Sequence, residues 1–444
     1  MGKLFGTDGV RGVANADLTP ELAFALGRSG AYVLTDGRER PRLVVGRDTR
    51  RSGEMLEAAL TAGILSAGGE VLSVGVLPTP AVAYLTHALE ADAGVMISAS
   101  HNPVEDNGIK FFSAQGYKLP DATEDRIEAL LTAQDLPRPT GAGVGIRHEV
   151  DNAAELYLNH LISELGVDLS GLKIALDAAN GAAFAVAPEI LRRLGAELVL
   201  LNCEPSGVNI NVNCGSTHPE GLKDAVRASG CCLGLAFDGD ADRLLAVDER
   251  GELVDGDQIM TILALAEQEK GRLNGLGVVA TSMSNMGLEL ALKEHGLELV
   301  RTQVGDRYVL EELLKRGWTL GGEQSGHIIN LQHNTTGDGI STALQLLGVL
   351  ADKKVPLSVL ASAMPRLPQL LVNVSVKTKD GWKENPSIVQ AVQSAEARLQ
   401  RRGRVVVRAS GTEPLMRIMV EGEDAVLLET IARDLAAVIR TELG

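Results

Sequence analysis

The alternation of apolar and polar stretches repeats one local pattern in three parts of the chain. In each part a short apolar run leads into a polar loop, a helical stretch and a glycine, and a second apolar run follows. The three patterns begin at Leu43, Lys173 and Gly277. Short apolar runs predict buried strands, and the polar loop and the glycine provide the ends of a helix. The pattern therefore predicts three related α/β units with mostly parallel, mixed sheets covered by helices.

The last part of the chain follows a different pattern. Apolar runs at 404–408 and 416–420 flank a polar loop and predict two strands, and a helical stretch begins near Ala425. This order predicts a smaller C-terminal α+β domain. Proline- and glycine-rich stretches and turns lie between the predicted units. We therefore expect four domains, at 1–150, 151–252, 253–366 and 367–444.

The composition narrows the class of protein. Of the 444 residues, 45% are apolar and 23% are charged, which is enough to build several cores and is unlike a disordered chain. The net charge of −16 and an aromatic content of 3% argue against nucleic-acid binding and against anionic membranes. The same charge repels a phosphorylated ligand, so local arginines and backbone amides must hold any such ligand.

The chain shows no targeting or metal-binding cysteine pattern. Its first residues, MGKLFGTDGVRG, lack the basic and apolar segments of a signal peptide, and no apolar run is long enough to span a membrane. The cysteines lack paired C-x-x-C spacing. We expect a cytoplasmic protein with reduced thiols. The cysteines are Cys203, Cys214, Cys231 and Cys232.

The stretch GVMISASHNPVEDNGIKFF, from Gly94 to Phe112, combines a buried strand with reactive side chains. The run GVMI predicts a strand, and the Asn-Gly pair at 107–108 predicts a turn before the next strand. Ligand loops in α/β proteins lie at the carboxyl ends of strands. Two serines and a histidine at such a position indicate a functional loop.

The stretch FDGDADR, from Phe237 to Arg243, carries aspartates at alternate positions. In extended backbone this spacing directs all three carboxylates to one side, where a divalent cation such as Mg²⁺ would offset their repulsion. An EF-hand calcium loop is disfavoured because Arg243 takes the position of the required glycine. A phosphatase with Asp238 as nucleophile and a solvated acidic turn remain alternatives.

Three further motifs carry weaker signals. GEQSGH, from Gly322, gathers polar groups between glycines that allow a close backbone approach, although a turn with a structural histidine fits equally well. RASGTEPLMR, from Arg408, has the arginines and open amides that are typical of an anion site. An ordinary hairpin turn is the alternative interpretation. FGTDGVRG, from Phe5, is by itself only weak evidence of a functional site.

Together, and in this order along the whole chain, the five motifs resemble those of the α-D-phosphohexomutase superfamily. The resemblance implies four domains around a central cleft, and a serine that carries a phosphate, here Ser100. It implies that the phosphoserine and the aspartates of the acidic loop hold one Mg²⁺. The implied metal ligands are Ser100, Asp238, Asp240 and Asp242.

The resemblance also implies roles for residues around the transferred phosphoryl group and the sugar. Arg11 and Lys110 fall where the family has cations near that group, and His101, Lys110 and His327 are the candidates for proton transfer. The implied substrate contacts are Arg243, Arg307, Glu323, Ser325, His327, Arg408, Ser410, Gly411, Thr412 and Arg417.

Smaller features resemble the branch of the family that acts on glucosamine phosphates. These are Gln324 in GEQSGH, the stretch VNIN from Val208 and the stretch CGSTHPE from Cys214. We expect an isomerase that converts glucosamine 6-phosphate into glucosamine 1-phosphate for amino-sugar metabolism, with glucosamine 1,6-bisphosphate as intermediate and activator. Its partners would be hexosamine phosphates and, in a homodimer, a second copy of the chain.

Three alternatives stay open from the sequence. The same chemistry acts on glucose or mannose phosphates in the phosphomannomutase/phosphoglucomutase branch. A metal-dependent sugar-phosphate phosphatase would use Asp238 as its nucleophile. A calcium-binding module would have no catalytic activity.

Overall fold

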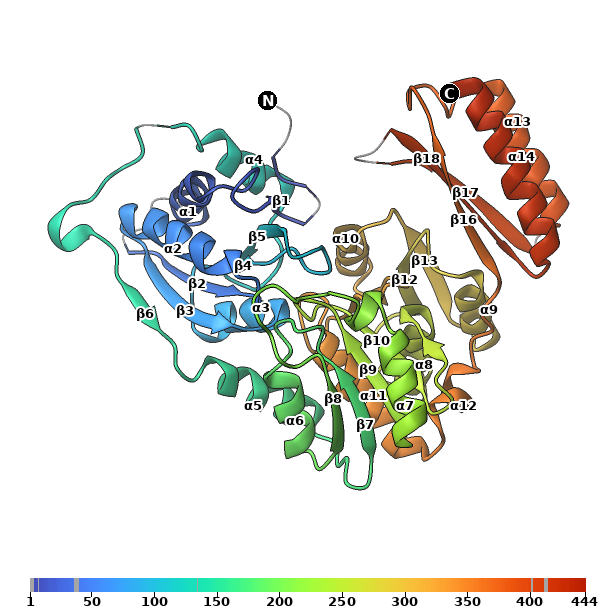
Figure 1. The fold of residues 1–444 in the computed structure, drawn as a ribbon, viewed down its shortest axis with the longest axis horizontal. Helices are drawn as coiled ribbons and strands as arrows, with labels where there is room; N and C mark the ends of the chain where they lie inside the picture. The colour runs from blue at the N-terminus through green and yellow to red at the C-terminus, as the bar shows by residue number, and fades with distance from the viewer. Residues whose placement is uncertain (1–3, 7, 36–39, 134, 401, 411–413) are drawn as a thin grey trace.

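The computed structural model describes residues 4–6, 8–35, 40–133, 135–400, 402–410 and 414–444. These residues form four sheets with helices against them (Figure 1). We call the parts built on these sheets the first, second, third and C-terminal units, in chain order. The predicted fold class, three α/β units followed by a smaller unit, is confirmed.

The first unit has a six-stranded mixed sheet in the order β1-β5-β4-β2-β3-β6. Adjacent residues Val44 and Val45 belong to different cores, one on each face of the sheet. Both faces are therefore buried, which explains why its inner strands read as unbroken apolar runs. Its elements are β1 (Val10–Val13), α1 (Pro20–Leu34), β2 (Arg42–Arg47), α2 (Ser52–Ser66), β3 (Glu70–Val76), α3 (Thr79–Ala88), β4 (Ala93–Ile97), β5 (Asp106–Ser113), α4 (Asp121–Ala129) and β6 (Arg147–Glu149).

The second unit has a five-stranded sheet in the order β11-β10-β9-β7-β8. The repeated pattern beginning at Lys173 forms two parallel strands, β7 and β8, as predicted, whereas β9 and β10 are antiparallel and joined by the acidic loop. Its elements are α5 (Ala153–Leu165), β7 (Lys173–Asp177), α6 (Val186–Arg193), β8 (Glu197–Leu201), α7 (Glu220–Ser229), β9 (Leu233–Phe237), β10 (Leu244–Asp248) and β11 (Leu253–Val254).

The third unit has a four-stranded sheet in the order β13-β12-β14-β15. Strands β12 and β13 are parallel, as the pattern beginning at Gly277 predicts. The first helix, α8, begins with a capping box in which Asp255 and Gln258 exchange hydrogen bonds. Its elements are α8 (Gly256–Glu269), β12 (Gly277–Thr281), α9 (Met286–Glu294), β13 (Glu298–Thr302), α10 (Asp306–Arg316), β14 (Leu320–Gly322), β15 (Ile328–Asn330), α11 (Gly339–Lys353) and α12 (Leu357–Ala361).

The C-terminal unit has an antiparallel sheet in the order β16-β18-β17. Helices α13 and α14 lie on its outer side in Figure 1 and pack against one face of the sheet. The opposite face carries polar side chains that belong to the candidate site. The elements are β16 (Gln369–Ser375), α13 (Pro386–Leu399), β17 (Gly403–Ala409), β18 (Leu415–Gly422) and α14 (Ala425–Leu443).

The Asn-Gly pair at 107–108 does not form the predicted turn. Asn107 and Gly108 lie within β5, where they pair with Gly12 and Arg11 of β1. Asn107 is buried and donates a hydrogen bond to Ser52 Oγ, and a Cβ at Gly108 would come 2.5 Å from Ser98 O. Pairing and close packing therefore overrode the local turn preference.

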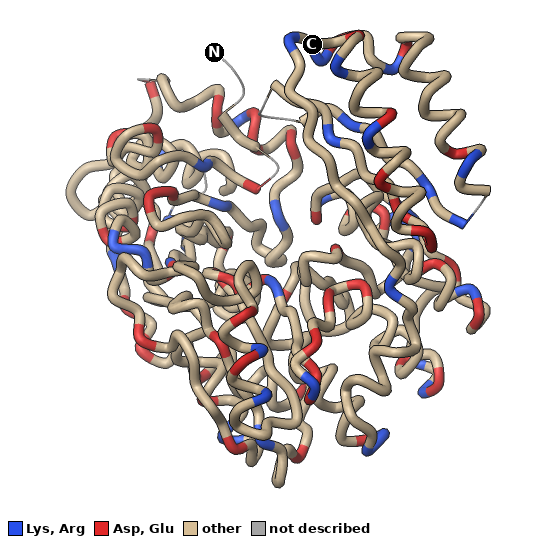
Figure 2. The backbone as a smooth tube through the Cα atoms, turned by 45° about the vertical axis from the view of Figure 1, so that its right-hand side comes forward, with Lys and Arg blue, Asp and Glu red and all other residues tan. Residues whose placement is uncertain are grey.

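Charged residues of both signs are distributed over all four units (Figure 2). The net charge of −16 is thus not confined to one acidic segment. Among the described residues, no helix is long and apolar enough to cross a membrane.

Candidate active site

Ser100 lies in the loop between β4 and β5 and is held in an unusual backbone conformation. Its φ is +53°, in the left-handed region, which costs about 1–2 kcal/mol for a residue with a Cβ. The residue is 1% exposed. Its Oγ donates a hydrogen bond to Asp238 Oδ2 at 2.5 Å and lies 3.2 Å from His101 Nδ1. The serine of the first unit therefore contacts the acidic loop of the second.

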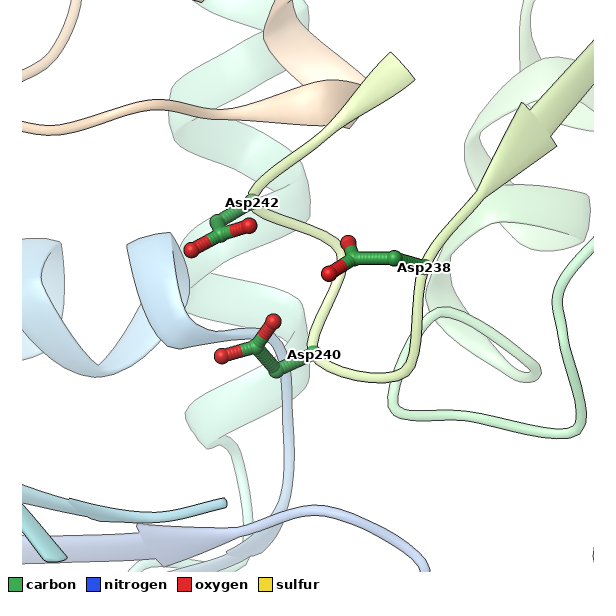
Figure 3. Close-up of side chains that lie close together, drawn as sticks. All are labelled: Asp238, Asp240 and Asp242. Carbon is green, nitrogen blue, oxygen red and sulfur yellow. The ribbon is translucent and has the colours of Figure 1, made fainter. Parts of the chain in front are cut away.

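The acidic loop brings its three carboxylates together, but not through an extended backbone. Residues 238–243 turn between β9 and β10, and Ala241 has a φ of +57°. One oxygen from each of Asp238, Asp240 and Asp242 lies within 4.8 Å of the others (Figure 3). The predicted convergence is confirmed, whereas the predicted extended geometry is wrong because the loop must reverse the chain between two antiparallel strands.

The electrostatics of this loop fit a divalent cation. Burial, together with the charges of Asp242 and Asp240, raises the pKa of Asp238 well above its ordinary value. Burial also disfavours the charged form of Asp242, but His327, Lys110 and Arg243 outweigh it and lower the pKa of that carboxyl. Among the described residues, Oδ1 of Asp240 and Oδ1 of Asp242 are buried without a hydrogen-bond partner. Converging, incompletely satisfied carboxylate oxygens are a donor set that suits Mg²⁺.

Lys110 on β5 is the main cation beside the triad. Its Nζ lies 2.8 Å from Asp240 Oδ2 and 3.1 Å from Asp8 Oδ2, and the residue is 2% exposed. Burial disfavours its charge, but the carboxylates of Asp240, Asp8 and Asp242 outweigh this effect and raise the pKa of Lys110. Thr79 Oγ1, at the start of α3, also donates to Asp240 Oδ2 at 2.6 Å.

Two further predicted cations lie in the same cluster. Arg11 forms an ion pair with Asp8, and its Nη1 lies 3.5 Å from Asn102 Oδ1 in the Ser100 loop. The backbone N–H of Arg243 donates to Asp238 Oδ1 at 3.2 Å. The Nε atoms of both arginines are buried without a hydrogen-bond partner among the described residues.

The two predicted histidines have opposite electrostatics. Burial and the charges of Arg243 and Arg11 lower the pKa of His101 to about 4, so this ring is neutral near pH 7. Burial disfavours protonation of His327 as well, but Asp242 and Asp306 outweigh it and raise its pKa. The N–H of Gly337 donates to His327 Nε2 at 3.2 Å, which leaves Nδ1 to carry a proton toward Asp242, 3.5 Å away.

The loop between β14 and β15 carries the predicted sugar-binding residues. Glu323 Oε1 accepts a hydrogen bond from Gly305 N at 3.1 Å, and Ser325 Oγ is buried without a partner among the described residues. Gln324 Nε2 instead donates to Asp255 Oδ2 at 3.3 Å, at the cap of α8. The side chain that marks the glucosamine branch thus contacts the third unit's own helix in this structure.

The structure adds residues that the sequence analysis did not assign. Lys118 forms ion pairs with Asp8 at 2.5 Å and with Asp306, whose Oδ2 lies 3.5 Å from His327 Nε2. These contacts join the first and third units beside the triad. Lys118 follows the IKFF strand and Asp306 precedes Arg307, so their proximity to quoted motifs was the available signal.

Arg307 lies in contact with the first unit rather than with the triad. Its guanidinium forms ion pairs with Asp121 and with Glu124, the latter at 3.0 Å, and donates to Leu119 O at 3.3 Å. Its side chain is 13% exposed. Its predicted contact with substrate therefore requires a rearrangement of these ion pairs.

The predicted distal phosphate site lies on the C-terminal sheet. Arg408 of β17 and Arg417 of β18 are directly paired across the two strands and border a cavity of about 180 Å³ together with Asn373. Burial and the neighbouring Arg417 charge lower the pKa of Arg408. Two adjacent guanidinium groups favour an anion.

The loop beside this pair is described only in part. Ser410 is 3% exposed, and its carbonyl accepts a hydrogen bond from Lys379 Nζ at 2.7 Å. The other two predicted contacts, Gly411 and Thr412, lie outside the described residues.

Comparison with known proteins identifies every part of the chain. Four phosphoglucomutase/phosphomannomutase families match in order: alpha/beta/alpha domain I over residues 2–138, domain II over 155–251, domain III over 255–367 and the C-terminal domain over 371–438. The chain is 62% identical to a phosphoglucosamine mutase of Moorella thermoacetica, over 99% of both chains. It is 59% identical to a phosphoglucosamine mutase of Symbiobacterium thermophilum, over 100% of both.

Two solved structures have similar folds. A phosphoglucomutase/phosphomannomutase family protein of Burkholderia thailandensis aligns with a TM-score of 0.83 at 25% identity, covering 98% of this chain and 97% of that one. An N-acetylphosphoglucosamine mutase of Aspergillus fumigatus, solved with GlcNAc-6P and magnesium, aligns with a TM-score of 0.67 at 20% identity, covering 99% and 95%. On the strength of the full-length identities, the chain belongs to the phosphoglucosamine mutases, isomerases of the α-D-phosphohexomutase superfamily.

Proposed function

We propose that this mutase interconverts glucosamine 6-phosphate and glucosamine 1-phosphate, with Ser100 as the carrier of the phosphoryl group. The observation that carries the proposal is the 2.5 Å contact between Ser100 Oγ and Asp238 inside the carboxylate triad. A serine hydroxyl beside a metal-type carboxylate cluster suits reversible phosphoryl transfer. The names of the relatives at 62% and 59% identity support glucosamine as the sugar.

The triad and the phosphorylated Ser100 would together hold one Mg²⁺. The buried, unpartnered oxygens of Asp240 and Asp242 support this assignment, as does the magnesium in the Aspergillus fumigatus complex. When bound, the ion offsets negative charge on the phosphoryl group during transfer. Lys110, Arg11 and Arg243 supply additional positive charge at the same place.

In the first transfer, phosphoserine donates its phosphoryl group to O1 of glucosamine 6-phosphate. The bond between Ser100 Oγ and phosphorus breaks while a bond from phosphorus to the sugar O1 forms. The O1 proton goes to a protein base, and Ser100 Oγ takes a proton from a protein acid as it leaves phosphorus, so Ser100 is left as a hydroxyl. The product is glucosamine 1,6-bisphosphate, bound at the site.

In the second transfer, the bisphosphate has turned end for end and returns its other phosphoryl group to Ser100. The bond between phosphorus and the sugar O6 breaks while a bond from phosphorus to Ser100 Oγ forms. The Ser100 hydroxyl proton goes to a protein base, O6 takes a proton from a protein acid, and glucosamine 1-phosphate leaves. We assign the binding of whichever phosphate is not reacting to Arg408, Ser410 and Arg417, and also to Gly411 and Thr412, which lie outside the described residues. The position of Arg408 and Arg417 on the sheet face opposite α13 and α14 supports this role.

Proton transfer is assigned to the groups around Ser100. Lys110, with its raised pKa, carries a proton in the resting cluster, and His101 is neutral and 3.2 Å from Ser100 Oγ. His327 Nδ1 lies 3.5 Å from Oδ2 of Asp242 in the triad. We assign Glu323 and Ser325 to the sugar hydroxyls, and Arg307 to the substrate after release from Asp121 and Glu124.

We propose that each of the four units is one domain, with one adjustment to the predicted boundaries. We retain the boundaries after residues 150 and 366, but move the boundary at 252 to follow Val254. Strand β11 (Leu253–Val254) pairs with β10 and so belongs to the second sheet. We propose that the substrate binds between these domains.

Phosphopeptide mapping and a coupled assay test the function. We expect purified protein to carry one phosphate, on Ser100, and to turn over glucosamine 6-phosphate faster than glucose or mannose phosphates. Release of inorganic phosphate without label on Ser100 would favour the phosphatase. Faster turnover of glucose or mannose phosphates would shift the assignment to the other mutase branch.

Thermal melting with and without MgCl₂ tests the metal separately from activity. Binding only to the folded protein raises the midpoint with ion concentration. We expect that rise in wild-type protein and its loss in Asp240→Asn. An equal rise in both proteins would contradict the assigned ligand set.

A further inference from the structure

The carbonyl groups of the Ser100 loop are held by two side chains to which the sequence analysis gave no role, Arg50 and Asn211, the last residue of the VNIN stretch. Arg50 Nη2 donates to Ser100 O at 3.2 Å and to Asn102 O at 2.6 Å. Asn211 Nδ2 donates to the same two oxygens, at 2.9 and 3.1 Å. Each carbonyl therefore accepts one hydrogen bond from the first unit and one from the second.

The arginine of this clamp is itself fixed. Arg50 is 0% exposed and forms an ion pair with Asp48, which also accepts hydrogen bonds from Arg50 N at 2.9 Å and from Ser98 Oγ at 2.5 Å. Ser98 Oγ in turn accepts a hydrogen bond from Ser100 N at 2.9 Å. Both the N–H and the carbonyl of Ser100 are thus tied to the same buried network.

The asparagine of the clamp is held by the second unit. Asn211 is 9% exposed and has a φ of +60°, and its N–H donates to Ala179 O at 3.0 Å. Its loop meets the first unit again where Arg51 N donates to Gly207 O at 2.9 Å. A Cβ at Gly239 of the acidic loop would come 2.4 Å from Ser100 O and 2.9 Å from Asn211 Nδ2. The serine loop, the asparagine and the acidic loop are therefore in direct contact.

We propose that Arg50 and Asn211 are positioning residues that hold Ser100 in its left-handed conformation, with Oγ directed at Asp238. The inference rests on Ser100 being the phosphoryl carrier. A single misplaced donor would allow the serine backbone to relax toward an ordinary conformation and turn its Oγ away from the triad. The clamp donates to backbone carbonyls of the carrier loop, so its loss should affect transfer more than substrate binding.

Asn211→Gly is the sharpest variant, because glycine accepts the positive φ while the side-chain donor is removed. Asn213→Gly is the matched control, since Asn213 lies on the same loop with a φ of +52° and is exposed. Arg50→Lys is a second variant that keeps the charge beside Asp48 but loses the planar fork. We would measure kcat and KM for glucosamine 6-phosphate per folded molecule, and phosphate on Ser100 by intact mass.

For Asn211→Gly we expect kcat to fall about 10²-fold with KM within about two-fold of wild type. Arg50→Lys should lower kcat at least about ten-fold, and Asn213→Gly should match wild type within about two-fold. Wild-type kcat in both Asn211→Gly and Arg50→Lys would overturn the inference, as would a rise in KM alone. Wild-type protein that never carries phosphate on Ser100 would instead overturn the proposed function.

Discussion

The surroundings of Ser100 and of the Arg408–Arg417 pair show two different ways to build a site. Ser100 and Lys110 are 1% and 2% exposed, and their hydrogen bonds and ion pairs link the first unit to the second. The two arginines are part-buried on a separate sheet, beside a cavity of about 180 Å³. The proposed transfer site is closely packed, whereas the proposed distal phosphate site borders a cavity.

The attachment of the C-terminal sheet explains part of this difference. Across one face of that sheet, Gln369, Glu421 and Arg404 form a polar row. Arg404 donates to Ser284 O at 2.6 Å and Gln369 donates to Met283 O at 3.1 Å. Through these two hydrogen bonds the polar row attaches the C-terminal sheet to the third unit, whereas Ser100 and the triad belong to the first and second units.

The largest effect is expected at the transfer site. Ser100→Ala removes the carrier hydroxyl and should lower kcat at least about 10³-fold, while the thermal midpoint stays near that of wild type. A coupled assay and circular dichroism measure the two quantities. Ser113→Ala, at the end of β5, is the control and should remain active. Full activity of Ser100→Ala would show that Ser100 does not carry the phosphoryl group.

The next effect is expected at the distal site. Arg417→Ala removes one charge-assisted contact with phosphate and should raise KM for glucosamine 6-phosphate by about 10–10²-fold, with a smaller change in kcat. Steady-state kinetics measure the split. Arg433→Ala, on the exposed side of α14, should leave both constants unchanged. A loss confined to kcat would contradict the assignment of phosphate binding to the distal site and of phosphoryl transfer to the Ser100 site.

A smaller effect on activity is expected from the polar row. Arg404→Met leaves Glu421, which is 0% exposed, without its ion pair and should destabilise the protein by about 3 kcal/mol. Replacing both residues by methionine should recover most of that stability. Both variants lose the bond to Ser284 O, so KM should stay raised by about three-fold in each. Denaturant melts of the two variants measure the effect on stability, and kinetics measure the effect on KM. An unchanged KM would show that the polar row has no role in aligning the substrate.

The smallest effect on activity is expected at Asp257, a buried carboxyl near this attachment. Burial and the neighbouring Asp255 charge raise the pKa of Asp257 to about 7, so the folded state favours the neutral form. Its stabilising contribution is complete below the unfolded pKa and is lost as pH rises through about 7. Relative to Asp257→Asn, wild-type stability should fall by about 2 kcal/mol between pH 5.5 and 7.

Denaturant melts of the two proteins across this pH range check the prediction. Asp257→Asn should keep wild-type kinetics, because Asp257 contacts Asn285 N rather than the reacting groups. A constant stability difference between the two proteins from pH 5 to 8 would contradict the raised pKa.

Much of the fold was predictable because it is encoded locally. The runs beginning at Leu43, Lys173 and Gly277 form strands β2, β7 and β12, each parallel to the strand after its helix. The strand conformation of Asn107 and Gly108 was not predictable from the local sequence, because pairing with β1 outweighed the turn preference of this pair. The backbone geometry of the acidic loop was not predictable either, although its residue types indicated that three carboxylates would lie close together.

By itself, the sequence determined the strand–helix order, the chemistry of the side chains and the motifs that resemble the superfamily. Only the tertiary structure decided which of these side chains meet: Ser100 with Asp238, and Arg50 and Asn211 with the carbonyls of the Ser100 loop. Tertiary packing also turned Arg307 toward α4 and shifted the pKa values of the two histidines in opposite directions. The reason is physical: strand and helix preferences act between neighbours, whereas burial and charge depend on residues brought together from distant parts of the chain.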